Sequence, residues 1–191
     1  MKEILMAKQF KTLNSDQQDF IQRQHIFFVS SATAGSRVNI SPREISALRI
    51  VDDHHVIYLD RTGSGNETAA HMLADGRLTI MFCAFSGTPQ IMRLYGTGTS
   101  VGWEKAEFEG LISQYYGGVI PLGTRQIMRL NFDLIQTSCG YGVPLFDYKG
   151  DRSAIENWHD NKGPDGIKSY WEQKNLSSID GLPTGLKVTN G

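Results

Sequence analysis

The sequence has few cysteines, no long hydrophobic run and almost no net charge. Its 191 residues contain two cysteines, Cys83 and Cys139, and no Cys-x-x-Cys motif, so a disulfide framework is excluded. The longest strongly apolar run, residues 78–85, is far shorter than the roughly 20 residues that cross a bilayer. Nineteen Lys and Arg stand against 20 Asp and Glu, a formal net charge of −1, which argues against the broad basic surface that nucleic acid requires.

These absences predict a reduced, cytoplasmic protein that binds neither nucleic acid nor membrane. Residues 1–12 carry three lysines but no apolar stretch of the kind found in signal peptides. The five histidines show no spacing typical of metal ligands, so no metal site is predicted. Hydrophobic residues make up 40% of the chain, which is enough for one domain with a substantial core.

The chain is rich in short strand patterns joined by tight turns, with few helices between them. This arrangement predicts a mainly β fold, an antiparallel barrel with peripheral helices, rather than a doubly wound sheet. Gly96 and Gly98 interrupt the longest strand and indicate a bend or bulge. The predicted strands are 25–32, 37–41, 47–51, 56–59, 77–85, 90–101 and 126–136, and the predicted helices are 14–24, 67–74, 103–116, 153–159 and 164–174.

Four details of this prediction depend on single residues. Ser15 and Gln18 have capping-box spacing at the first helix. Residues 25–32 are apolar at both alternating positions, as in a strand buried on both faces. Pro42 is expected to stop the strand that follows Gly35, and Pro164 to open the last helix. The barrel is expected to span residues 20–136, with residues 137–191 forming a loop and a helical C-terminal extension.

The loop at residues 61–68, Arg-Thr-Gly-Ser-Gly-Asn-Glu-Thr, is the strongest candidate site. It follows a strand and begins a helix, where free N–H groups and the helix dipole favour an anion such as a phosphate. The alternative is an ordinary connector in which Asn66 caps the helix. It is neither a Walker loop, since Glu67 replaces the lysine, nor a dinucleotide fingerprint, since Thr68 replaces the third glycine.

Two further groups of residues are candidates for ligand contacts. Arginine binds phosphate through its planar fork, and four arginines lie in or just after strands near this loop in sequence. Cys139 lies in a predicted loop with two glycines and a tyrosine, and it is either part of a structural loop, a reactive thiol, or in contact with a ligand ring. The four arginines are Arg37, Arg43, Arg61 and Arg93.

Eight segments occur in a characteristic order along the chain. The first six are Phe-Phe-Val-Ser-Ser-Ala at 27–32, Arg-Val-Asn-Ile-Ser-Pro at 37–42, Val-Ile-Tyr-Leu-Asp at 56–60, Gly-Ser-Gly-Asn-Glu-Thr-Ala-Ala-His at 63–71, Leu-Thr-Ile-Met-Phe at 78–82 and Met-Arg-Leu-Tyr-Gly at 92–96. The last two are Cys-Gly-Tyr-Gly-Val-Pro at 139–144 and Ser-Ile-Asp-Gly-Leu-Pro at 178–183. Their order resembles the pyridoxamine 5'-phosphate oxidase-like family of FMN-binding split barrels. The resemblance covers about residues 20–135 and, with the last two segments, most of the chain.

This resemblance implies a homodimer with FMN bound in two clefts at the subunit interface. Cys139 and Tyr141 are the residues implied near the flavin ring, and no catalytic residue is identified. The phosphate and ribityl chain would be held by the first strand pair and the loop, hence by Arg37, Asn39, Ser41, Arg43, Tyr58, Asp60, Arg61, Thr62, Ser64, Gly65, Asn66 and Thr68.

The chain departs from the family pattern at two places. Many members have an Arg-Lys pair where this chain has Glu67-Thr68, so the positive charge for a phosphate must come from elsewhere, for example from Arg37, Arg43 or Arg61. Substrate binding in true pyridoxamine 5'-phosphate oxidases uses an Arg-x-His near the C-terminus, and residues 171–191 contain no histidine.

The leading hypothesis is an FMN-dependent oxidoreductase acting on an unknown small molecule. The alternatives are a non-catalytic carrier of flavin, haem or deazaflavin, and a true pyridoxamine 5'-phosphate oxidase.

Overall fold

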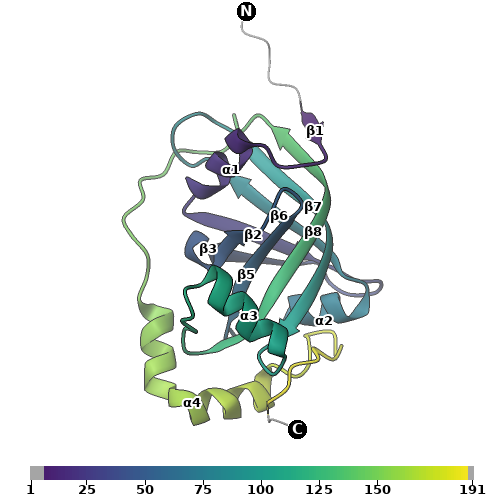
Figure 1. Ribbon diagram of the computed structural model, residues 1–191, viewed down its shortest axis with the longest axis vertical. Helices are drawn as coiled ribbons and strands as arrows, with labels where there is room; N and C mark the ends of the chain where they lie inside the picture. The colour runs from purple at the N-terminus through teal and green to yellow at the C-terminus, as the bar shows by residue number, and fades with distance from the viewer. Residues whose placement is uncertain (1–6, 189–191) are drawn as a thin grey trace, which may run out of the picture.

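The computed structural model describes residues 7–188 as one curled sheet with helices around it (Figure 1). The strands are β1 (Lys8–Phe10), β2 (Ile26–Ser31), β3 (Asn39–Glu44), β4 (Leu48–Ile50), β5 (His55–Arg61), β6 (Arg77–Cys83), β7 (Ile91–Gly102) and β8 (Thr124–Ser138). The helices are α1 (Ser15–Gln22), the 3₁₀ turn η1 (Ile45–Ala47), α2 (Glu67–Ala74), α3 (Ala106–Tyr115) and α4 (Ala154–Lys174).

Every pair of neighbouring strands in the sheet is antiparallel, as predicted. The strand order is β3-β2-β6-β7-β8-β5-β4, and β1 pairs with β8 outside this path. The end strands β3 and β4 follow one another in the chain, with η1 between them. The sheet therefore curls until the β3 end approaches β5, and this seam positions the candidate site described below.

The capping box of the first helix lies one residue before the predicted one. Asn14 caps α1: its side chain accepts a hydrogen bond from the backbone N–H of Gln17, and the Gln17 side chain accepts one from the backbone N–H of Asn14. The prediction of Ser15 and Gln18 was wrong by one residue because two adjacent cap formers precede two adjacent glutamines. Phe20 and Ile21 of α1 are buried in the core.

The hairpin of β2 and β3 corrects two predictions. Pro42 lies inside β3, paired with Phe28, instead of ending the strand. Proline lacks a backbone donor, but β3 is at the edge of the sheet and has a neighbour on one side only. In β2, buried positions alternate with partly exposed ones, so this strand is half-buried and not covered on both faces.

The glycines of β7 have the role predicted for them. The pairing of β7 with β8 shifts register between Tyr95 and Gly96. A Cβ atom at Gly96 would overlap the backbone oxygen of Asn131, and one at Gly98 would overlap the sulfur of Met72 on α2. Both positions lack space for a side chain, so the strand can bend against β8 and pack against α2.

The core has a main cluster inside the barrel and two smaller ones at its edges. Met128, Leu130 and Phe132 of β8 point inward and belong to the main cluster. Ile127, on the opposite side of the same strand, packs with α3. Part of β8 is therefore buried on both faces.

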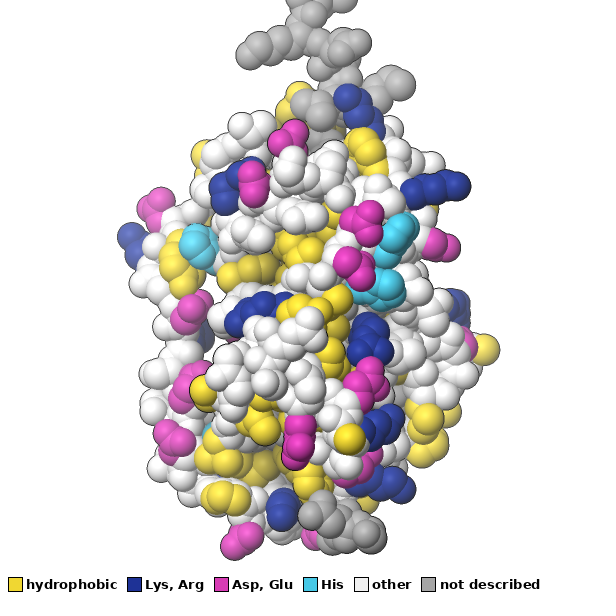
Figure 2. Space-filling model, viewed as in Figure 1, with side chains coloured by type: hydrophobic (Ala, Val, Ile, Leu, Met, Phe, Trp, Pro, Cys, Tyr) yellow, Lys and Arg dark blue, Asp and Glu magenta, His cyan; other side chains and the backbone are white. Residues whose placement is uncertain are grey.

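The C-terminal part of the chain runs down the outside of the barrel and then turns beneath it (Figure 1). Residues 139–153, here called the strap, connect β8 to α4. Helix α4 is broken at Gly163, whose φ of 63° is followed by Pro164, in agreement with the two predicted helices. Within residues 7–188, no helix is both long enough and apolar enough to cross a membrane. Charged side chains of both signs are intermixed on the face in Figure 2.

Candidate functional site

The two ends of the curled sheet are joined by side chains at Asp60. On one side of this β5 carboxylate, Arg43 of β3 donates from Nη2 to Oδ1 over 2.9 Å. On the other side, Arg125 of β8 approaches Oδ2 through Nη2 at 2.9 Å, and Gln126 donates to Oδ2 over 2.8 Å. These contacts close the seam, since among the described residues no backbone ladder joins β3 to β5. Arg43, Asp60 and Arg125 are called the arginine cluster below.

The arginine cluster holds two guanidinium groups against one carboxylate. Asp60 and Arg125 are each 1% exposed. Burial lowers the pKa of Arg125, and repulsion from Arg43 adds to this effect while Asp60 opposes it. Burial acts most strongly and lowers the pKa of Arg43, but Asp60 and, to a smaller extent, Tyr58 and Glu44 together outweigh it and leave that pKa raised. The cluster therefore has an excess of positive charge.

Three buried donors around Asp60 have no hydrogen-bond partner among the residues of the structure. They are Nε of Arg43, Nε of Arg125 and the hydroxyl of Tyr58. Burial raises the pKa of Tyr58 well above its usual value, so its phenol stays protonated. Unpaired buried polar groups are costly, and donors clustered in this way are suited to an oxygen-rich anion.

A cavity of about 710 Å³, the seam cavity, opens beside the arginine cluster. This volume lies in the range of small-molecule sites. Its walls come from β3, from the loop before α2, and from the chain after α4. Nine of the predicted ligand-binding residues line it: Arg37, Asn39, Ser41, Arg43, Asp60, Ser64, Gly65, Asn66 and Thr68.

The loop before α2 is more than an ordinary connector. Asn66 occupies the N-cap position, but its side chain makes no capping hydrogen bond. Its oxygen accepts from Gln126 at 2.9 Å, and its nitrogen donates to the backbone oxygen of Asn175 at 3.3 Å. The side chain thus ties the loop to β8 and to the C-terminal segment. A Cβ at Gly63 would meet nothing within 4 Å, so the loop has open space in front of it.

The side chain of Glu67 binds the C-terminal segment of the chain. Both carboxylate oxygens of Glu67 accept from the backbone N–H of Ile179 at 3.0 Å. Asp180 forms an ion pair with Arg37 and also accepts from its backbone N–H at 2.8 Å. The charge of Glu67 is therefore used to hold the segment that carries the Ser-Ile-Asp-Gly-Leu-Pro motif, and this segment forms one wall of the seam cavity.

Three of the predicted ligand residues lie next to the seam cavity without lining it. Tyr58 is fully buried beneath it. Thr62 is also buried: its hydroxyl donates to the backbone oxygen of Gly123 at 2.7 Å and accepts from Nε1 of Trp171 at 2.7 Å. Arg61 pairs with Glu156 of α4 at 2.6 Å and lines a second cavity under the strap.

Two other predicted residues lie at the far end of the molecule. Cys139 and Tyr141 follow the last residue of β8, whereas the arginine cluster lies at the first residues of this 15-residue strand. Neither residue lines the seam cavity or the cavity under the strap. Within one chain the structure does not bring them together with the other candidates.

Sequence reasoning missed Arg125, which is as deeply buried as Asp60. Along β8, Arg129, Asn131 and Asp133 face away from the barrel interior, and Arg125 shares their alternation. That alternation predicts an exposed side chain, but β5 and the loop before α2 cover this end of the strand: Arg125 donates to the backbone oxygen of Gly65 at 2.9 Å. Lys174, Ser177 and Ser178 also line the cavity and were not predicted.

Comparisons with known proteins agree on the family and the fold. The family model described as pyridoxamine 5'-phosphate oxidase matches residues 13–139. A protein of Aspergillus flavus, "Pyridoxamine 5'-phosphate oxidase family protein ustO", is 36% identical over 193 aligned residues, covering 91% of this chain and 76% of that protein.

Solved structures give the same fold at low sequence identity. HupZ of Group A Streptococcus matches with a TM-score of 0.52 and 20% identity, covering 64% of this chain and 91% of HupZ. A Clostridium acetobutylicum protein of the pyridoxinephosphate oxidase family, related to general stress protein 26, matches with a TM-score of 0.50 and 12% identity. The match covers 65% of this chain and 86% of that protein. The curled antiparallel sheet with peripheral helices is thus the split barrel predicted from the sequence.

Proposed function

Because the chain belongs to the pyridoxamine 5'-phosphate oxidase family, we propose that it binds FMN with the phosphate in the seam cavity. The observation that carries this proposal is the arginine cluster, with its excess positive charge and its unpaired buried donors. A phosphate offers oxygens to several donors at once, and charge-assisted hydrogen bonds are the strongest that proteins make. The residues at the seam fit this group.

The two arginines of the arginine cluster take the place of the Arg-Lys pair that many family members carry at Glu67-Thr68. Arg43 and Arg125 supply the positive charge from the cavity floor. Neutral groups complete the set: Asn39 donates to the hydroxyl of Thr68 at 3.1 Å, and Ser41 donates to the Asn39 oxygen at 3.3 Å. Glu67 repels a phosphate, so we place the phosphate on the β3 side of the cavity.

We further propose that the protein acts as a homodimer. Val38 and Ile40, on β3 or directly before it and beside the seam cavity, are 65% and 66% exposed. Apolar side chains of this size next to a binding site are typical of a surface covered by a partner. A second protomer seated here would shield the cavity mouth from water. Size-exclusion chromatography with light scattering tests this point.

When bound, FMN would supply the electron chemistry, which supports a flavin-dependent oxidoreductase of unknown substrate. The chain's own part is to hold the phosphate, orient the cofactor and limit access of water. Two other functions remain as outcomes of the test: a non-catalytic carrier of flavin, haem or deazaflavin, and a true pyridoxamine 5'-phosphate oxidase.

The proposal is tested by comparing FMN with riboflavin, which lacks the phosphate. Quenching of flavin fluorescence gives both dissociation constants. Two or more charge-assisted hydrogen bonds to the phosphate, at about 1.5–3 kcal/mol each, predict FMN binding at least about 100-fold tighter than riboflavin. Arg125→Met is expected to reduce this ratio about tenfold or more. Because the ratio is measured within one variant, it is insensitive to general loss of stability.

Arg129→Met is the matched control, since Arg129 lies on the same strand, partly exposed, and pairs with Glu107 at 2.6 Å. Its ratio should equal that of the wild type. Equal affinity of the wild type for FMN and riboflavin would contradict the proposal. Reduction of the bound flavin by NADH or NADPH would favour an oxidoreductase, whereas a flavin or haem that stays unreactive would favour a carrier. Formation of pyridoxal 5'-phosphate from pyridoxamine 5'-phosphate would identify a true oxidase of that substrate.

A further inference from the structure

A second cavity lies on the other side of Arg43, between the strap and the β2–β3 edge of the barrel. Its volume is about 880 Å³, again within the range of small-molecule sites. The strap is attached at its middle and is close to the barrel again where α4 begins. Phe146 donates its backbone N–H to the backbone oxygen of Phe85 at 2.9 Å, and Glu156 pairs with Arg61 at 2.6 Å. The space beneath the strap is called the strap cavity.

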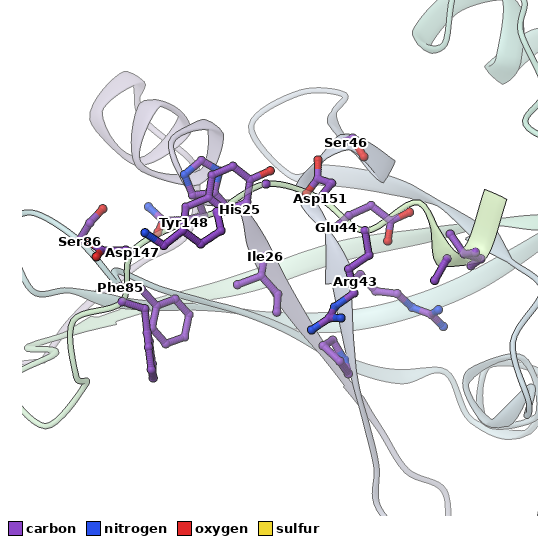
Figure 3. Close-up of a pocket in the computed structure, with 18 of the residues that line it drawn as sticks. His25, Ile26, Arg43, Glu44, Ser46, Phe85, Ser86, Asp147, Tyr148 and Asp151 are labelled. Carbon is purple, nitrogen blue, oxygen red and sulfur yellow. The ribbon is translucent and has the colours of Figure 1, made fainter. Parts of the chain in front are cut away.

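The two ends of the strap cavity differ in chemistry (Figure 3). At one end, the rings of His25 and Tyr148 stack in parallel, with centroids 3.7 Å apart and an interplanar angle of 1°. Phe85 and Phe146 lie at the same end, with centroids 5.5 Å apart. Arg43 and Glu44 lie at the other end, and Ile26 lies between the two ends of the cavity (Figure 3).

The aromatic end is unusually open for side chains of this kind. Phe146 is 62% exposed and Tyr148 is 49% exposed, although both line the cavity. Aromatic side chains gain most when a second ring or an apolar surface covers them. A planar aromatic molecule beneath the strap would cover them.

The arginine end provides a donor for an oxygen atom. Arg43 and Arg61 both line the cavity, and Nε of Arg61 is buried without a hydrogen-bond partner among the described residues. Five Lys and Arg side chains and four Asp and Glu side chains line the cavity, so their charges nearly balance. This balance suits an acceptor group of low charge, such as a carboxylate, a sulfonate or a carbonyl, and disfavours a polyanion.

We propose that the strap cavity is a binding site for a planar aromatic compound that carries one oxygen-acceptor group. Its ring would pack against Phe146 and Tyr148, and its acceptor would face the Nε–H group of Arg61. The cavity is distinct from the proposed phosphate site, and binding here does not require FMN. Since Arg43 lines both cavities, a molecule under the strap would lie next to an occupant of the seam cavity.

The experiment uses two fluorescent probes with the full-length protein. 8-Anilinonaphthalene-1-sulfonate has an aromatic ring system and an acceptor group, whereas N-phenyl-1-naphthylamine has the same rings without the acceptor. Hydrogen bonds to a charged group contribute about 1.5–3 kcal/mol, so the sulfonate is expected to bind at least about tenfold tighter than the uncharged probe. Loss of one aromatic contact contributes about 0.5–1.5 kcal/mol, so Tyr148→Ala and Phe146→Ala should each weaken sulfonate binding about threefold to tenfold.

Leu145→Ala is the matched control, because Leu145 is the neighbouring exposed apolar residue of the strap and does not line the cavity. It should bind the sulfonate like the wild type. Equal weakening by all three substitutions, or equal affinity for the two probes, would overturn the proposal. Probe binding that decreases as the protein is concentrated would instead identify the strap as a surface between two copies of the chain, and would also overturn it. Saturation of the protein with FMN beforehand separates the two proposals, since the strap cavity should still bind the probe.

Discussion

Replacing Asp60 with asparagine removes the negative charge that Arg43 and Arg125 share, with little change in side-chain shape. Arg43 can turn partly toward water, because its side chain is 21% exposed, whereas that of Arg125 is 1% exposed. Leaving a buried charge without its partner costs about 3–5 kcal/mol, and the freedom of Arg43 places the expected loss near the lower end. Asp60→Asn should therefore reduce the free energy of unfolding by about 3 kcal/mol.

Urea unfolding followed by tryptophan fluorescence measures this loss, since the chain has three tryptophans. With a slope near 3 kcal/mol/M, the upper end for small proteins, the midpoint should decrease by about 1 M. Asp133→Asn, on the exposed side of β8, is the control and should leave the midpoint nearly unchanged. Adding Arg125→Met to Asp60→Asn removes the unpaired charge and should recover part of the loss. A midpoint for Asp60→Asn equal to that of the control would refute the role assigned to the arginine cluster in closing the seam.

Two further predictions concern single residues outside the site. Hydrogen bonds from the side chain and backbone of Arg77, and from the Thr33 hydroxyl, lower the pKa of Asp75 to about 2. The stability that Asp75 contributes is therefore fully present above its unfolded pKa of about 3.9 and is lost as the pH falls toward 2. An NMR titration should give a midpoint near 2, Arg77→Ala should raise it toward the ordinary value, and an unchanged midpoint in that variant would contradict this cause. Gly123 has a φ of 82° and a Cβ there would overlap the ring of His159, whereas Gly117 has a φ of 64° and open space. Overpacking should cost Gly123→Ala roughly 1–3 kcal/mol more stability than Gly117→Ala loses, and thermal unfolding should show this as a lower melting temperature. Equal melting temperatures would show that His159 can move away freely.

Local patterns in the sequence were sufficient for most of the secondary structure. Helix α2 was predicted with the same bounds that it has in the structure. The bulge at Gly96 and the helix break before Pro164 were also predicted, because turn, bulge and helix-break preferences act within a few residues. The loop before α2 was identified for the same reason, because a strand end followed by a helix start is a local signal.

The outcome for Pro42 and Arg125 was decided by tertiary structure. Pro42 can remain within a strand because β3 lies at the edge of the sheet, and no local pattern specifies an edge. Arg125 is buried because the curl of the sheet brings β3, β5 and β8 around Asp60. The alternation along β8 assigns its side chain to the outer face, and only the closure of the seam together with the docking of the C-terminal segment turns that face into the floor of a cavity.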